Sequence, residues 1–145
     1  MSSSKIPLYL RSYVNAEGIT VTRVVAYVGF LKRDGDQLKV RAIIDTGAPV
    51  SLIPFNVWSW CPVELGKQGF IKSVSGREEC DLEVYQGEIT IALFDEAGNM
   101  LLSDLTIKVD LCATSEMPTL LGVHDFLSCG CLHVDYAQGE AWFEI

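Results

Sequence analysis

The sequence has few basic residues and no long hydrophobic run. It carries 11 Lys and Arg residues against 19 Asp and Glu residues, a formal net charge of −8, and the basic residues form no run. Because neutralisation of phosphates drives nucleic-acid binding, this balance argues against a nucleic-acid partner. No apolar stretch approaches the roughly 20 residues that span a bilayer, so we also expect no membrane partner.

The sequence also has little that points to secretion. Residues 1–5 contain no apolar core of the length that a secretory signal needs. Cysteine is present in an odd number, which favours free thiols in a reducing compartment over a disulfide framework. The five are Cys61, Cys80, Cys112, Cys129 and Cys131. We therefore expect a cytoplasmic location, although a domain excised from a longer protein would show the same pattern.

Several common catalytic and cofactor motifs are missing. There is no Gly-x-Ser-x-Gly elbow and no glycine-rich phosphate loop. Cys129-x-Cys131-x-His133, with His124 nearby, has spacings shorter than the two to four intervening residues usual for structural zinc pairs. No cysteine stands at a predicted helix start that would activate it as a nucleophile. Metal binding and cysteine catalysis remain weaker alternatives, and we expect no metal and no cofactor.

The composition that is present predicts one folded, β-rich domain. The 145 residues are 49% hydrophobic and 21% charged, which is typical of a folded soluble chain. Asp34-Gly35 separates two runs rich in β-branched residues, a strong hairpin signal. We expect strands at 19–30, 38–44, 69–74, 78–85, 87–94 and 101–111, and short helices near 55–60 and 125–128. The segment 1–18 is weakly patterned, with an edge strand expected at 8–14.

One stretch carries a polar motif at the end of an apolar strand. Ala42-Ile43-Ile44 runs directly into Asp45-Thr46-Gly47, after which apolar residues resume. A carboxylate at the end of a buried strand is costly unless partners surround it. The alternative is an ordinary Asp-Thr-Gly turn, because Asp and Gly both favour turns. On these three residues alone, both interpretations stand.

The wider context resembles a known family. The pattern Ile-Ile-Asp-Thr-Gly-Ala-x-x-Ser-x-Ile-Pro, residues 43–54, resembles the active-site segment of retroviral-type (retropepsin-like) aspartic proteases. Thr119-Leu120-Leu121-Gly122, followed by Asp125-Phe126-Leu127, resembles the strand and short helix near the end of the same unit. The resemblance implies an all-β, retropepsin-like closed barrel or sandwich over residues 19–145, with a flap hairpin and one short C-terminal helix. It also implies that strands 42–44 and 119–121 pair.

The resemblance implies an aspartic endopeptidase. Attack of water on an amide needs both a base and an acid, and two adjacent carboxylates that share one proton supply both. The chain holds one Asp-Thr-Gly, so an active enzyme would be a homodimer with one Asp45 from each subunit. Its substrate would be an extended polypeptide segment. The alternative, from a different class, is a non-catalytic retropepsin-like module that dimerises and binds peptides.

The resemblance also assigns roles to individual residues. Asp45, Thr46 and Gly47 would be catalytic, and the substrate-binding residues would be Gly47, Ala48, Val74, Ser75 and Gly76, the last three at the tip of the flap. Two features depart from the family pattern. Pro49 stands where viral members have an acidic residue, and Val123-His124 offers no arginine to pair with one. In addition, two residues rather than one separate Gly122 from Asp125.

The last five residues, Ala141-Trp142-Phe143-Glu144-Ile145, predict an apolar terminal strand. A lone strand of this kind would be a sticky edge in a monomer. In the resembled fold, the chain ends of both subunits interleave into one sheet, which would cover that edge. We therefore expect this strand to form part of a dimer interface.

Overall fold

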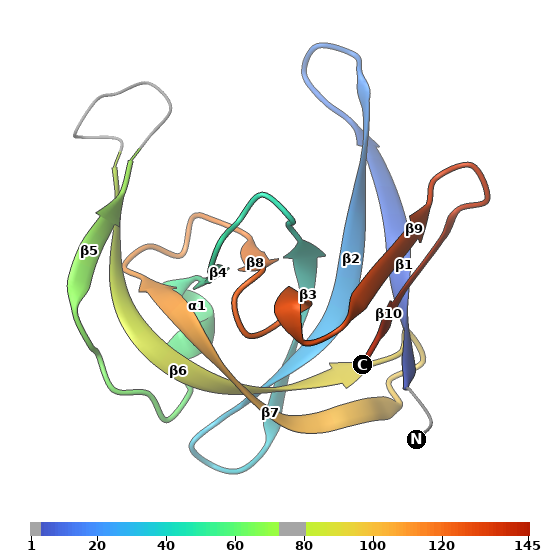
Figure 1. Ribbon diagram of the computed structural model, residues 1–145. Helices are drawn as coiled ribbons and strands as arrows, with labels where there is room; N and C mark the ends of the chain where they lie inside the picture. Colours follow the sequence, from blue (N-terminus) through green and yellow to red (C-terminus); the bar gives the residue numbers. More distant parts are fainter. Residues whose placement is uncertain (1–3, 73–80) are drawn as a thin grey trace.

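The computed structural model describes residues 4–72 and 81–145, which are mainly β-strand (Figure 1). The strands are β1 Lys5–Val14, β2 Thr20–Leu31, β3 Gln37–Ile44, β4 Ser51–Ile53, β5 Gln68–Ile71, β6 Leu82–Phe94, β7 Met100–Cys112, β8 Thr119–Leu121, β9 Cys131–Asp135 and β10 Glu140–Glu144. Two short helices, α1 Phe55–Trp58 and the 3₁₀-helix η2 Leu127–Cys129, complete the fold. Within these residues, no helix is long and apolar enough to cross a membrane. The expectation of an all-β chain with a short C-terminal helix is confirmed.

The sheet closes on itself to form a barrel. Its strands follow the order β5-β6-β7-β4-β8-β3-β2-β1-β10-β9, and β6 also pairs with β2, from Tyr27 opposite Phe94 to Phe30 opposite Ile91. This second pairing joins β2, β3, β8, β4, β7 and β6 into a ring. Closure of a sheet leaves the strands of the ring without open edges. The closed barrel predicted from the sequence is therefore confirmed.

The barrel interior follows from the alternation of side chains along each strand. Val28 and Phe30 of β2, Ala42 of β3 and Leu121 of β8 point inward and are completely buried. Long strands β6 and β7 contribute Ile91, Leu93, Ile107, Val109 and Leu111 to the same cluster. On β3, β4 and β8 the intervening residues Ile43, Leu52 and Leu120 are only half-buried, whereas on β2 and β6 intervening residues such as Val25 and Ala92 are buried as well.

Strand β6 runs unbroken where the sequence predicted two strands on either side of residue 86. Gly87 lies in its middle, opposite Val109 of β7. A Cβ atom at Gly87 would come within 2.6 Å of Leu111 Cδ1. Glycine here marks a close approach between neighbouring chain segments, not a turn. Strands β5 and β6 form the hairpin expected of the flap, but Val74, Ser75 and Gly76 lie outside the described residues.

Strand β1 is longer than the edge strand expected at 8–14, because it begins at Lys5. It changes partner along its length: Lys5–Leu8 pair with β10, whereas Tyr9–Val14 pair with β2 alone, as an edge strand does. Ile6 and Leu8 are 1% and 5% exposed, so the strand contributes an apolar face to the core. The weak pattern of the segment concealed this alternation, because Pro7 interrupts the β-rich composition.

Strand β10 has both edges paired within its own chain, so it is not the open edge that the sequence predicted, and its part in a dimer interface stays a prediction. It pairs with β1, Lys5 opposite Glu144, and with β9, Trp142 opposite His133, within the same chain. Both of its edges are thus occupied. Phe143 is completely buried and stacks on Phe126, with ring centroids 5.1 Å apart. The apolar character of the terminal strand therefore serves the core of its own subunit, and β9 ends the sheet.

Phe143→Ala should destabilise the fold by about 3–5 kcal/mol, because it removes a buried ring and leaves a cavity against Phe126. Urea unfolding followed by tryptophan fluorescence measures this loss. Glu140→Ala, an exposed substitution on the same strand, is the matched control and should change stability by no more than about 0.5 kcal/mol. Equal stabilities for the two variants would contradict the internal placement of β10.

Candidate active site

Asp45 continues the line of strand β3 beyond its last residue. Strands β3 and β8 are parallel, with Ala42, Ile43 and Ile44 opposite Thr119, Leu120 and Leu121, as the sequence predicted. The N–H of Asp45 donates to the carbonyl of Leu121 at 2.9 Å, which extends this ladder by one residue. Because Ile44 points into the barrel, the alternation directs Asp45 outward, to the same side as Ile43.

The Asp45 carboxylate is held by its own loop, residues 45–50. Its Oδ1 accepts a hydrogen bond from the N–H of Gly47 at 2.9 Å, and its carbonyl accepts one from Ala48 N–H at 3.2 Å. Asp45 is half-buried, Thr46 and Gly47 are exposed, and Ala48 is buried. No second hydrogen bond to the carboxylate is present within residues 4–72 and 81–145, so Oδ2 has no partner there. The loop thus orients one carboxylate oxygen and leaves the other for solvent or a ligand.

A second segment, residues 122–124, braces the Asp45 loop from the end of β8. Gly122 N–H donates to Ser51 Oγ at 2.9 Å, and Ser51 is completely buried. Val123 N–H and His124 N–H donate to the carbonyls of Ala48 and Pro49, each at 2.9 Å. A Cβ atom at Gly122 would collide with the Ala48 carbonyl and lie 3.0 Å from the Val50 oxygen. Only glycine fits between the two segments.

These main-chain bonds account for the two departures from the family pattern. The Pro49 carbonyl is bonded to His124 N–H, so the loops are tied together although neither an acid at 49 nor an arginine at 123–124 is present. Asp125 adopts a left-handed conformation with φ 63°. Its Oδ2 accepts a hydrogen bond from Lys108 N–H at 2.8 Å, which fixes the end of the longer connection against β7.

A continuous row of side chains crosses the outer face of the barrel beside Asp45. Strand register places Ile43 opposite Leu120, Leu120 opposite Leu52, and Leu52 opposite Asp110. We call these four residues the outer row. The three apolar members are only half-buried, whereas their neighbours Ile44, Leu121 and Ile53 are buried. An apolar floor therefore leads from the Asp45 loop across β8 and β4 and ends at Asp110 on β7.

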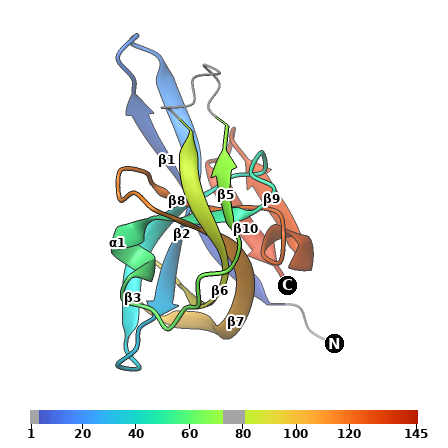
Figure 2. The same cartoon turned by 90° about the vertical axis from the view of Figure 1, so that its left-hand side faces the viewer.

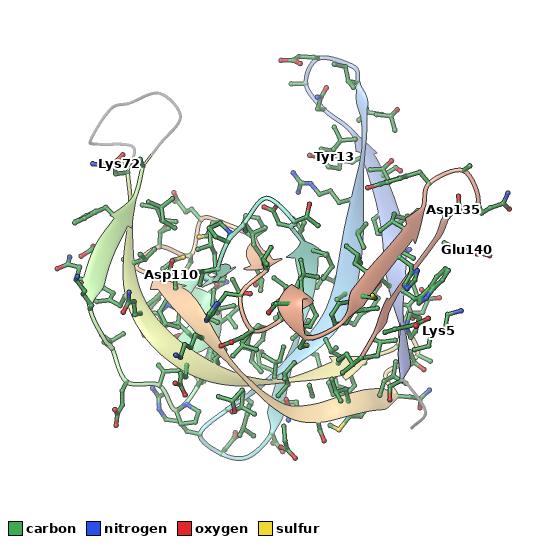
Figure 3. The ribbon with its side chains drawn as sticks, in the orientation of Figure 1. Lys5, Tyr13, Lys72, Asp110, Asp135 and Glu140 are labelled. Atoms are coloured by element: carbon green, nitrogen blue, oxygen red, sulfur yellow. The ribbon has the colours of Figure 1, made fainter. Side chains whose placement is uncertain are left out.

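Two cavities lie on either side of the Asp45 loop, and neither includes Asp45 itself. The larger, about 850 Å³, includes Val50 of the loop together with residues of β6 and β7. The smaller, about 340 Å³, lies against Ala42 and Ile43 and is bounded by β1 and β2. In Figure 1 the β5–β6 pair and the β1–β2 hairpin rise on opposite sides of this loop, and Figure 3 labels Asp110 and Tyr13 on these two sides.

The described cysteines, which the sequence left as alternative nucleophiles or metal ligands, are not held in place as the Asp45 carboxylate is. Burial raises the pKa of the Cys61 thiol to about 11 and that of Cys112 to about 12, the latter with a smaller contribution from Asp110. Both thiols are therefore protonated near neutral pH, which makes them poor nucleophiles. Burial also raises the pKa of the Cys129 thiol. In the part of the chain that the structure describes, no group of three or more His, Cys, Asp or Glu residues is placed to hold a metal ion.

The structure thus brings Asp45, Thr46, Gly47 and Ala48 into one braced loop, and their assigned roles stay predictions. Sequence reasoning missed the part played by Ser51, which appeared only as one letter of the motif. The available signal was a serine directly after the loop 45–50, between apolar Val50 and Leu52, because a polar group in a buried stretch requires a partner. Sequence reasoning also missed Asp110, for which no local signal exists.

Comparison with known proteins identifies the fold. The chain is similar to a retropepsin-like aspartic protease from Rickettsia conorii, with a TM-score of 0.58 and 12% identity over 99% of this chain and 92% of that one. It also aligns with the EIAV protease complexed with the inhibitor HBY-793, with a TM-score of 0.40 and 18% identity over 74% of this chain and 86% of that one. Neither a protein-family model nor a curated protein sequence matches the chain. The chain therefore has the retropepsin-like fold.

Ser51→Ala should destabilise the fold by about 1–3 kcal/mol, because it leaves the N–H of Gly122 buried without an acceptor. Thermal or urea unfolding measures the loss. Ser12→Ala removes an exposed hydroxyl that is hydrogen-bonded to Thr22, and it should cost no more than about 0.5 kcal/mol. A Ser51→Ala protein as stable as the Ser12→Ala control would show that the brace contributes nothing.

Proposed function

We propose that this chain is an aspartic endopeptidase that hydrolyses peptide bonds in extended polypeptide segments. The observation that carries the proposal is the Asp45 loop. The loop holds an accessible carboxylate by one oxygen and is itself braced by residues 122–124. A carboxylate fixed in this way is positioned for chemistry, because a catalytic group must be held in place before the substrate arrives. The retropepsin-like fold supports the same conclusion at the level of the fold.

The reaction needs two carboxylates. One, ionised, takes a proton from a water molecule, whose oxygen attacks the carbonyl carbon of the scissile amide. The other, protonated, donates its proton to the carbonyl oxygen. Collapse of the tetrahedral intermediate breaks the C–N bond, the amine leaves with a proton, and the carboxylic acid product retains the oxygen of the water. Like charges held close together cannot both ionise easily, which keeps one proton on the pair.

The second carboxylate is proposed to come from a second copy of the chain. Thr46 and Gly47, which flank Asp45, are exposed, as a two-fold contact between loops requires. Strand β9 ends the sheet and offers an open edge for a partner. In Figure 2, η2 and the β9–β10 hairpin lie on one side of the molecule, and the loop after β3 reaches the same side. A partner subunit on that side would contact both the open edge of β9 and the Asp45 loop.

The substrate is proposed to bind as an extended chain over the outer row, whose apolar members provide contact for side chains. Gly47 and Ala48 would bind its main chain, and Val74, Ser75 and Gly76 would cover it. We further propose that the protein works in the cytoplasm, a proposal supported by its cysteine content alone.

Asp45→Asn should abolish peptide cleavage and leave stability within about 1 kcal/mol of the parent, because the amide oxygen can still accept the Gly47 hydrogen bond. The assay is cleavage of a mixed peptide library, with a pepstatin-type inhibitor as a second probe. Asp36→Asn, an exposed substitution before β3, is the matched control and should retain full activity.

The library also separates the proposal from the non-catalytic alternative. A parent protein that binds library peptides without cleaving them would be a binding module. Cleavage by Asp45→Asn within tenfold of the parent rate, after removal of contaminating protease, would exclude the aspartic mechanism.

Adding excess Asp45→Asn protein to a fixed amount of the parent should titrate the activity towards zero. Subunits exchange into mixed dimers that hold one competent carboxylate each, so active pairs become rare. The measurement is the cleavage rate against the ratio of the two proteins after they reach exchange equilibrium. Albumin at the same mass concentration controls for simple competition. A rate unaffected by the variant, in a protein that sedimentation shows to exchange subunits, would mean that one Asp45 suffices.

A further inference from the structure

The outer row ends on a charged residue that the proposed reaction does not use. Asp110 lies on β7 opposite Leu52 of β4 and opposite Gln86 of β6. Three strand-to-strand steps separate it from Ile43, and each step is about 4.8 Å. Asp110 is therefore about 14 Å across the sheet from the strand that carries Asp45, on the same face. An extended peptide covers that distance with about four residues.

A cavity surrounds the Asp110 end of the row. It is about 850 Å³ in volume, and Val50 of the Asp45 loop and His124 of the brace contribute to one wall. The loop at residues 62–66 forms another wall, and Gln86, Glu88, Lys108 and Asp110 form the floor. The cavity is therefore continuous with the Asp45 loop through Val50, and it has room for a long side chain.

Among the described residues, none supplies a cation to the Asp110 carboxylate. It is half-buried, and no ion pair within 4.0 Å joins it to any described residue. Lys108 points to the same face two residues earlier, yet it makes no such pair either. Burial raises the pKa of the Asp110 carboxyl above its ordinary value, because desolvation disfavours the charge and no neighbour compensates. A cation brought by a ligand would supply that compensation.

We propose that Asp110 is a specificity-determining residue that selects a lysine or arginine side chain in the substrate, within about four positions of the cleaved bond. This inference rests on the proposed function. The apolar floor of the outer row binds the stem of such a side chain, and the carboxylate at its end binds the ammonium or guanidinium head. The half-buried position makes the charge pair stronger than one in open water.

The test uses peptide sets that share one cleavable core and vary a single flanking position among Lys, Arg, norleucine and Glu. The parent should cleave the Lys and Arg members of one set with a kcat/KM at least about tenfold above that of the norleucine member. Asp110→Asn should remove this preference through a rise in KM for the Lys and Arg peptides. Asp104→Asn is the matched control because Asp104 is an exposed acid on the same strand, and it should keep the preference.

A second measurement keeps this inference separate from the hydrolase proposal. Fluorescence polarisation reports the binding of the same peptides to Asp45→Asn protein, with and without Asp110→Asn. If the parent cleaves nothing but the Asp45→Asn protein binds cationic peptides through Asp110, the hydrolase proposal fails, and the recognition of a cationic side chain by Asp110 holds for peptide binding alone. Cleavage without any cationic preference, or a preference that survives Asp110→Asn, would overturn the inference and leave the hydrolase proposal intact. Absence of both cleavage and binding would overturn both.

Discussion

The position of β8 between β3 and β4 is the constraint from which the candidate site follows. Strands β3 and β4 are consecutive in the sequence, yet β8 pairs with both, parallel to one and antiparallel to the other. The loop 45–50 must therefore cross the end of β8 and span two strand spacings, about 10 Å. Such a crossing lifts the loop off the sheet and turns Asp45 outward. It also explains Gly122, since the chain leaving β8 passes directly against the Ala48 carbonyl.

The same constraint explains why the site contains so few side-chain interactions. The Asp45 loop and residues 122–124 are joined by two main-chain bonds and one bond to the buried Ser51 hydroxyl. Main-chain bonds do not depend on residue type, so Pro49 and His124 are acceptable where viral members of the resembled family use an ion pair. An acid–arginine pair would add charges that require their own partners. Because the bonds between the two segments involve no charged group, Asp45 is the ionisable side chain of the loop 45–50.

Local patterns predicted most of the strands, and long-range pairing decided what they missed. Asp34-Gly35 marks the hairpin between β2 and β3, and β-branched residues mark the strands on either side, so these elements were readable from the sequence. Strand β10 was read as an edge because no rule identifies Lys5–Leu8 as its neighbour, 133 to 139 positions away along the register. The break predicted at residue 86 is absent for the same reason, because what requires glycine at position 87 is Leu111 on another strand.

The candidate site likewise has one part that the sequence predicted and one part that it did not. The Asp45 segment was predictable because its residue types and spacing carry the chemistry within one stretch. Asp110 was not, since an acid that alternates with Val109 and Leu111 is typical of any outward position on a strand. Only the register across β8, β4 and β7 places it on the face of Asp45.

Charge distinguishes the two cavities beside the Asp45 loop. The smaller includes three arginines, Arg11, Arg23 and Arg41, but two of them are engaged within the chain. Arg11 pairs with Glu96 at 3.0 Å, and the Arg23 guanidinium lies 4.9 Å from the centre of the Tyr13 ring. The larger cavity instead presents the Asp110 carboxylate, to which no cation of the described residues is bonded. With a net charge of −8, the long-range field of the whole chain attracts cationic segments. The local and the global electrostatics therefore favour the same class of ligand at Asp110.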